Sequence, residues 1–154
     1  MALLEKAAHE ALPPHPCLVA FHGTFQDESS VYLLLELCAT DLYELARALG
    51  DAAGGLPESW ARIYSASVAL ALRHLHAHGW VYRDLKLENV LVDRAGHAKL
   101  ADLGAARPLH DGPRGGGEGG GGEGGAAPRR PPPALGTAET TPPEMIRGAP
   151  LDFA

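Results

Sequence analysis

Four polar residues of this chain have side chains that suit the transfer of a phosphoryl group. Asp84, Lys86 and Asn89 lie close together in one segment, and Asp102 follows a short apolar run. A carboxylate can accept a hydroxyl proton, an ammonium group can neutralise phosphoryl oxygens, and amide and carboxylate oxygens can bind Mg2+. Such a reaction needs positioning and charge neutralisation more than covalent help. The surrounding elements must therefore bring these four groups to one site.

The segment at residues 81–89, which reads VYRDLKLEN, resembles the catalytic loop of eukaryotic-type serine/threonine protein kinases, with Tyr82 in place of a histidine. The resemblance implies that Asp84 orients the substrate hydroxyl, that Lys86 faces the transferred phosphoryl group and that Asn89 binds magnesium. A lysine after Arg-Asp-Leu resembles the serine/threonine class rather than the tyrosine kinases.

A second match, Asp102-Leu103-Gly104, follows the strand expected at residues 98–100. Alone, this triplet would indicate only an ordinary turn. Its place behind a strand and after Asn89 makes it similar to the D-F-G turn of kinases, with Leu103 for phenylalanine. That similarity implies that Asp102 holds magnesium on the β- and γ-phosphates and that Gly104 allows a sharp turn.

A third match, GTAETTPPE at residues 136–144, is similar to the end of a kinase activation segment, G-T-P-E-Y-L-A-P-E. The match implies that Thr137 forms a hydrogen bond near Asp84 and Lys86. Pro133 stands where kinases of the AGC group carry a phosphorylatable threonine, so we expect no control by that modification.

The residues expected to face the nucleotide base lie upstream. LLLELC at residues 33–38 resembles the strand and hinge of the kinase small lobe. This implies that the backbone of Glu36 and Cys38 faces adenine, with Leu35 behind as gatekeeper. A buried strand followed by a turn would explain the same residues without a ligand. Asp41 could equally accept a ribose hydroxyl or cap the helix that follows it.

The start of the chain resembles the regulatory helix, because HPCLV at residues 15–19 is similar to the turn that follows that helix in kinases. Glu5 would then be the partner of the small-lobe lysine, with a solvated surface charge as the alternative. No V-A-I-K lysine occurs in the sequence, and the glycine run at residues 115–125 lacks the strand and lysine context of a phosphate-covering loop. We therefore expect the isolated chain to be weakly active or inactive.

The matches occur in family order and imply an α+β fold of the protein-kinase type. It would be truncated to the regulatory helix, the fourth and fifth strands of the small lobe and the first half of the helical large lobe. Residues 1–154 would form one partial kinase domain, nearest the AGC group and its cyclic-nucleotide-dependent members. Residues 111–133 are rich in glycine and proline, so we expect a disordered insertion in the activation segment.

Local patterns predict the elements that carry these residues. Helices are expected at residues 2–12, 41–49 and 57–78. Gly50 should end the second helix, and Gly79 suits the position just past the third. Strands are expected at residues 18–25, 31–37, 89–92 and 98–100. One face of the third helix is predicted to comprise Ile63, Tyr64, Val68, Ala71, Leu72 and Leu75.

Composition and charge limit the classes of partner that we expect for this chain. The net charge of −6 argues against a nucleic-acid surface, and no apolar run is long enough to span a membrane. Glu5 and Lys6 interrupt the apolar start, which argues against a signal peptide. Cys17 and Cys38 have no metal-ligand spacing and fit a reducing, cytoplasmic compartment. The expected partners are ATP and a protein or peptide substrate, with neither nucleic acid nor membrane.

The implied function is that of a protein serine/threonine kinase, which transfers the γ-phosphoryl group of ATP to a protein hydroxyl with Mg2+ as cofactor. The alternative is a pseudokinase or scaffold that uses a kinase-like fold for binding. The presence of Asp84, Lys86, Asn89 and Asp102 favours the enzyme.

Overall fold

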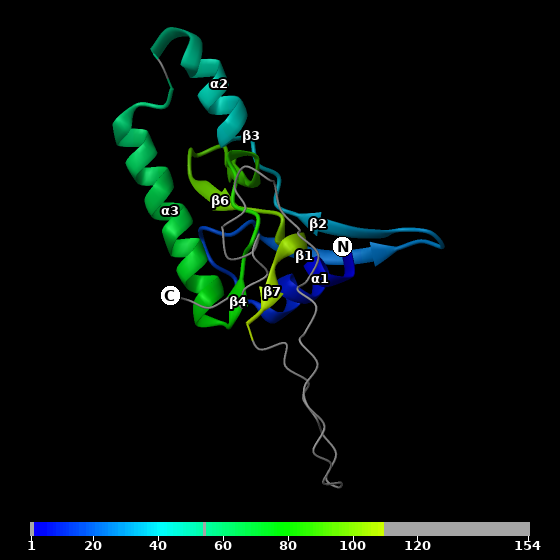
Figure 1. The fold of residues 1–154 in the computed structure, drawn as a ribbon. Helices are drawn as coiled ribbons and strands as arrows, with labels where there is room; N and C mark the ends of the chain where they lie inside the picture. The colour runs from blue at the N-terminus through cyan, green and yellow to red at the C-terminus, as the bar shows by residue number, and fades with distance from the viewer. Residues whose placement is uncertain (1, 54, 110–154) are drawn as a thin grey trace, which may run out of the picture.

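The computed structural model describes residues 2–53 and 55–109 of the 154-residue chain (Figure 1). The insertion expected at residues 111–133 and the activation-segment block that contains Thr137 lie outside the described residues. In the described part, helices precede and follow short antiparallel strands without a regular alternation. The fold is therefore α+β, as predicted.

The amino-terminal part consists of one helix and one hairpin. Helix α1 (Ala2–Ala11) ends shortly before two prolines, which cannot continue it. Strands β1 (Phe21–Gln26) and β2 (Val31–Leu35) pair antiparallel. The turn between them is held by Asp27, whose Oδ1 accepts hydrogen bonds of 2.8 Å from the main-chain N–H groups of Ser29 and Ser30.

The first strand begins later than predicted, because the residues before it bond elsewhere. Leu18 forms a parallel bridge with Leu100, and the main-chain N–H of Val19 donates to the carbonyl of Leu100 at 3.0 Å. This pairing attaches the hairpin to the part of the chain that carries Asp102.

Helix α2 (Leu42–Ala53) is capped by Asp41, whose Oδ1 accepts a hydrogen bond of 2.9 Å from the main-chain N–H of Glu44. The prediction that Gly50 ends this helix is wrong, because the helix continues through it to Ala53. A glycine in a helix interior costs only about 1 kcal/mol relative to alanine, which neighbouring helix formers can offset.

Helix α3 (Glu58–Ala77) is followed by Gly79, whose φ of 75° lies in the left-handed region that glycine tolerates. The prediction that Ile63 belongs to its buried face is wrong, since 62% of this residue is exposed. Successive residues of a helix point about 100° apart, so Ile63 is turned outward while its neighbour points inward. The buried residues of α3 are Tyr64, Ala71 and Leu75.

Short strands and turns carry the polar residues of interest. One antiparallel sheet has the order β3-β5-β6, formed by Thr40–Asp41, Val90–Val92 and Ala98–Leu100. A second pairs β4 (Trp80–Val81) with β7 (Arg107–Pro108). Two 3-10 turns, η1 (Leu87–Asn89) and η2 (Leu103–Ala105), precede β5 and follow β6. Asn89, predicted to begin a strand, therefore lies in a turn.

Figure 1 shows α2 and α3 on one side of the β3-β5-β6 sheet, with the β1–β2 hairpin projecting away on the other. One apolar cluster of the described residues joins the helices to this sheet, with buried members on α1, α3, β5 and β6 such as Ala8, Leu75, Val90 and Leu100. The segment from β4 to η2 runs through this cluster, so packing fixes its path.

Candidate active site

The loop between β4 and η1 brings three of the predicted residues into direct contact. The Nζ atom of Lys86 lies 3.0 Å from Oδ2 of Asp84. The Nδ2 atom of Asn89 donates to the same Oδ2 at 3.1 Å and to the Asp84 carbonyl at 2.9 Å. Asp84 and Asn89 are only 8% and 7% exposed. The carboxylate is thus held between an ammonium group and an amide with little freedom to turn.

The fourth predicted residue, Asp102, lies within electrostatic reach of this loop. The pKa of Lys86 is raised, first by its hydrogen bond to Asp84 and also by the charges of Asp84, Asp102 and Glu88. The main-chain N–H of Ala101 donates to the carbonyl of Asn89 at 2.9 Å, which ties the residue before Asp102 to the loop. Three acidic groups therefore surround one ammonium group.

The sharp turn at Asp102 is made differently from the prediction. Asp102 itself has a φ of 51°, in the left-handed region, whereas Gly104 lies within the 3-10 turn η2. The Oδ1 atom of Asp102 accepts a hydrogen bond of 3.1 Å from the main-chain N–H of Gly104. A short side chain that bonds to its local backbone lets aspartate adopt this conformation more readily than most residues.

Tyr82 is a residue whose positioning role the sequence analysis missed. Its side chain is buried, and its hydroxyl donates to the carbonyl of Ala101 at 2.6 Å. Burial raises the pKa of Tyr82, and the side chain of Asn89 bonds to its hydroxyl with a smaller, opposite effect. The phenol thus contacts both Asn89, a candidate magnesium ligand, and Ala101, the residue before Asp102. The signal was available, because a tyrosine buried beside a polar loop needs a hydrogen-bond partner.

Glu5 of α1 faces the same site from the other side. Burial raises the pKa of Glu5, and the charge of Asp102 raises it further. Within the described residues, Glu5 forms no ion pair with a basic side chain. Glu5 therefore lies within electrostatic reach of Asp102, and its pairing with a small-lobe lysine stays a prediction.

The predicted nucleotide-base residues lie along β2 and the segment after it. Leu35 ends β2 and is partly buried, and Glu36 and Cys38 follow it. The main-chain N–H of Glu36 donates to the carbonyl of Ala20 at 2.8 Å, so its amide is already used within the protein. Burial raises the pKa of the Cys38 thiol. For Asp41, the structure shows the capping alternative.

An ion pair that the sequence analysis did not predict fixes this segment. Nζ of Lys99, on β6, lies 2.6 and 2.8 Å from the two carboxylate oxygens of Glu36. The hydrogen bond from Lys99 holds the pKa of Glu36 below its usual range. The two residues are 63 positions apart, so no local pattern could have found the pair.

The donor set suits a magnesium ion. Because Nδ2 of Asn89 donates to Asp84, the amide oxygen Oδ1 remains as its acceptor, and Asp102 supplies a carboxylate. Mg2+ prefers such oxygen ligands and commonly completes its shell with phosphate oxygens and water. Among residues 2–53 and 55–109, no group of three or more His, Cys, Asp or Glu side chains is arranged to bind a metal without such help.

None of the described helices combines the length and apolar character needed to cross a bilayer.

Comparisons with known proteins concern the family of the chain. The family model described as "Protein kinase domain" matches residues 1–153. The chain is 34% identical over 145 residues to 3-phosphoinositide-dependent protein kinase 1 of Arabidopsis thaliana. The aligned region covers 90% of this chain and 27% of that protein. It is 41% identical to atypical protein kinase C of Drosophila melanogaster, covering 67% of this chain and 16% of the relative.

A similar match is found with the cAMP-dependent protein kinase catalytic subunit of Arthrobotrys oligospora, at 41% identity over 63% of this chain and 18% of the relative. The chain therefore spans about a quarter or less of the length of these curated relatives, between 16% and 27%. The resemblance to serine/threonine kinases, and to the AGC group among them, is confirmed by these matches.

Proposed function

The chain belongs to the protein kinase domain family, and we propose that it acts within a serine/threonine protein kinase that transfers the γ-phosphoryl group of ATP to a protein hydroxyl. The observation that carries the proposal is the position of the Asp84 carboxylate, bound by Lys86 at 3.0 Å and by Asn89 at 3.1 Å. The substrate is a protein or peptide that presents a serine or threonine hydroxyl.

Each loop residue has a distinct role in the proposal. Asp84 accepts the hydroxyl proton as the oxygen attacks phosphorus, which is the task of a positioned general base. Lys86 faces the phosphoryl group and neutralises its oxygens, as transition-state charge stabilisation requires. The fixed contacts of Asp84 with Lys86 and Asn89 support these roles, because they orient the carboxylate before substrate arrives.

Asn89 and Asp102 would hold Mg2+ through oxygen atoms. When bound, the ion supplies neutralisation of the β- and γ-phosphate charge. In the same proposal the backbone of Glu36 and Cys38 contacts adenine beside Leu35. Support comes from the Glu36–Lys99 ion pair, which holds that segment against β6. Thr137 lies outside the described residues, and its hydrogen bond near Asp84 and Lys86 remains a prediction.

A cytoplasmic location is part of the proposal. Cys17 and Cys38 are both free thiols, which fits a reducing compartment that also supplies ATP.

The test is phosphotransfer by the intact protein that contains this chain. Asp84→Asn keeps the side-chain shape but cannot accept a proton, so the transfer of labelled γ-phosphate to serine and threonine peptides should fall by about 10²- to 10⁴-fold. Glu28→Gln, on the exposed hairpin turn, is the matched control and should transfer as the unsubstituted protein does. Unaltered transfer by Asp84→Asn would refute the proposed role, and tight ATP binding without any transfer in the unsubstituted protein would favour a scaffold.

A further inference from the structure

Three histidines connect the turn after α1 to the end of α3. The rings of His15 and His74 are stacked with centroids 4.6 Å apart, and the rings of His74 and His78 lie 4.4 Å apart at 48°. His15 belongs to the turn between α1 and β1, whereas His74 is in the last turn of α3 and His78 caps it. We call these three residues the histidine row. It joins segments that are about sixty residues apart in the sequence, since His74 and Pro13 are separated by 61 positions.

Hydrogen bonds decide where the protons of the row lie. Nε2 of His74 faces the carbonyl of Pro13 at 3.0 Å, and Nδ1 of His78 faces the carbonyl of His74 at 2.8 Å. A carbonyl only accepts, so both of these ring nitrogens carry hydrogen. By contrast, the main-chain N–H of Cys17 donates to Nδ1 of His15 at 3.2 Å. That nitrogen must offer a lone pair, so His15 is neutral.

Among the described residues, the charged groups near His15 are either positive or paired with another residue. His74 and Arg73 face it from α3. His9, Glu10 and Lys99 line the same pocket of about 640 Å³. Burial lowers the pKa of His9, whose ring stacks on Phe21, and the two charged residues each have another partner. Lys99 is bound to Glu36 at 2.6 Å, and Glu10 lies 3.6 Å from Lys6.

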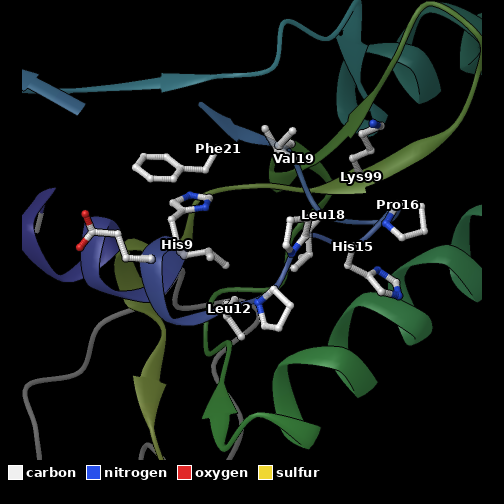
Figure 2. Close-up of a pocket in the computed structure, with 13 residues that line it drawn as sticks. His9, Leu12, His15, Pro16, Leu18, Val19, Phe21 and Lys99 are labelled. Carbon is white, nitrogen blue, oxygen red and sulfur yellow. The ribbon is translucent and has the colours of Figure 1, made fainter. Parts of the chain in front are cut away.

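Figure 2 shows the ring of His15 at one end of this pocket, directed toward α3. Within the described residues, no carboxylate forms an ion pair with His15. Burial lowers the pKa of His15, and the charges of His74 and Arg73 lower it further. The geometry and the electrostatics therefore both favour the neutral ring.

We propose that the histidine row is a pH-sensitive contact between the turn after α1 and helix α3. The contact holds while His15 is neutral, and it is released when His15 is protonated. Protonation places a ring N–H against the N–H of Cys17, which breaks that hydrogen bond within the turn. It also adds a positive charge beside Arg73 and His74, which weakens the stacking of His15 on His74 that holds the turn against α3. Because α1 carries Glu5 and α3 leads through β4 into the catalytic loop, release changes how firmly the two sides of the site are held together. No residue of the row belongs to the candidate active site, so the contact does not depend on the proposed function.

The sign of the effect follows from proton binding. The pKa of His15 in the folded chain lies below 6.5, its ordinary value. Between these two values the unfolded chain binds more protons than the folded chain, so the free energy of unfolding rises with pH. The stabilisation is complete above pH 6.5 and is lost as the pH falls toward the folded value.

The experiment measures urea unfolding of the 154-residue chain between pH 5 and 8, with and without His15→Phe. Phenylalanine keeps a flat ring in the row but cannot be protonated. On acidification the unfolding constant of the unsubstituted chain should rise about three- to tenfold more than that of the variant. His22→Gln, which removes an exposed histidine of β1, is the matched control and should keep the full pH dependence.

A second measurement decides the matter even if His15→Phe does not fold. Nitrogen–proton spectra of the imidazole rings in the unsubstituted chain should show His15 with hydrogen on Nε2 at neutral pH. Its titration should have a midpoint below 6.5, and the amide signal of Cys17 should move with the same midpoint. A midpoint at or above 6.5, or equal pH dependence of unfolding with and without His15→Phe, would overturn the proposal.

Discussion

The two sides of the candidate site differ in how their charges are paired. On the side built by β4, η1 and β5, the Asp84 carboxylate is bound by Lys86 and Asn89 at 3.0 and 3.1 Å. On the α1 side, Glu5 faces Asp102 and forms no ion pair within the described residues. The Asp84 carboxylate is therefore already paired, whereas Glu5 and Asp102 are two carboxylates whose mutual repulsion a cation would relieve.

This difference indicates which carboxylates are held in place by contacts among the described residues alone. Asp84 is oriented by bonds within its own loop, so its position should persist without nucleotide or metal. The position of Glu5 depends on burial that opposes its charge, so it should respond to any change at Asp102. Substitutions at Asp102, Tyr82 and Glu5 test that asymmetry.

Among the substitutions that test this asymmetry, the largest effect is expected from Asp102→Asn. Removing the carboxylate that we propose as a magnesium ligand should weaken the magnesium-dependent part of ATP binding by about 100-fold, measured by calorimetry with and without Mg2+. The same change should lower the pKa of Glu5, because it removes the charge that raises it. Asp93→Asn, in the turn between β5 and β6, is the control for a substituted aspartate outside the site. If the pKa of Glu5, followed by carboxyl carbon signals, did not move, then Glu5 and Asp102 would not face each other.

An intermediate effect is expected from Tyr82→Phe. The substitution leaves the buried carbonyl of Ala101 without the hydroxyl that donates to it at 2.6 Å. The free energy of unfolding should fall by about 1 to 2 kcal/mol, as measured in urea. Tyr43→Phe removes a hydroxyl from a side chain that is 47% exposed and should change stability little. Equal effects of the two substitutions would contradict the positioning role of Tyr82.

The smallest effect is expected from Glu5→Gln. Because the folded pKa of Glu5 is raised above 4.5, this residue contributes stability below pH 4.5 that is lost as the pH rises through the folded value. The glutamine variant should lack that loss and should be more stable at neutral pH, by less than about 1 kcal/mol since Glu5 is only partly buried. Glu28→Gln is the exposed control. A less stable Glu5→Gln variant would mean that Glu5 is already paired with a cation.

The contacts among Asp84, Lys86 and Asn89 could be predicted because these residues lie within a few positions of one another. Asp84, Lys86 and Asn89 meet through local backbone turns, so their spacing in the sequence carries the information. The helices and the β1–β2 hairpin were predictable for the same reason, since periodicity, turn residues and prolines are local signals.

What the sequence did not reveal depends on contacts between distant segments. The Glu36–Lys99 pair spans 63 positions, and the Tyr82–Ala101 hydrogen bond spans 19. The errors at Gly50 and Ile63 have a related cause, because helix continuation and burial are decided by packing as well as by residue type. The histidine row is of this kind too, since its rings meet only when the turn after α1 folds against α3.

The most direct test of the central claim is to locate the metal–nucleotide complex on the chain. Manganese can replace magnesium, and it broadens the amide signals of nearby residues in nuclear magnetic resonance spectra even when binding is weak. With Mn2+ and ATP added, the signals of residues 84–89 and 102–104 should broaden, while those of the hairpin turn at residues 27–30 should not. Broadening confined to other residues, or none at saturating nucleotide, would contradict the account that these four side chains face one phosphate group.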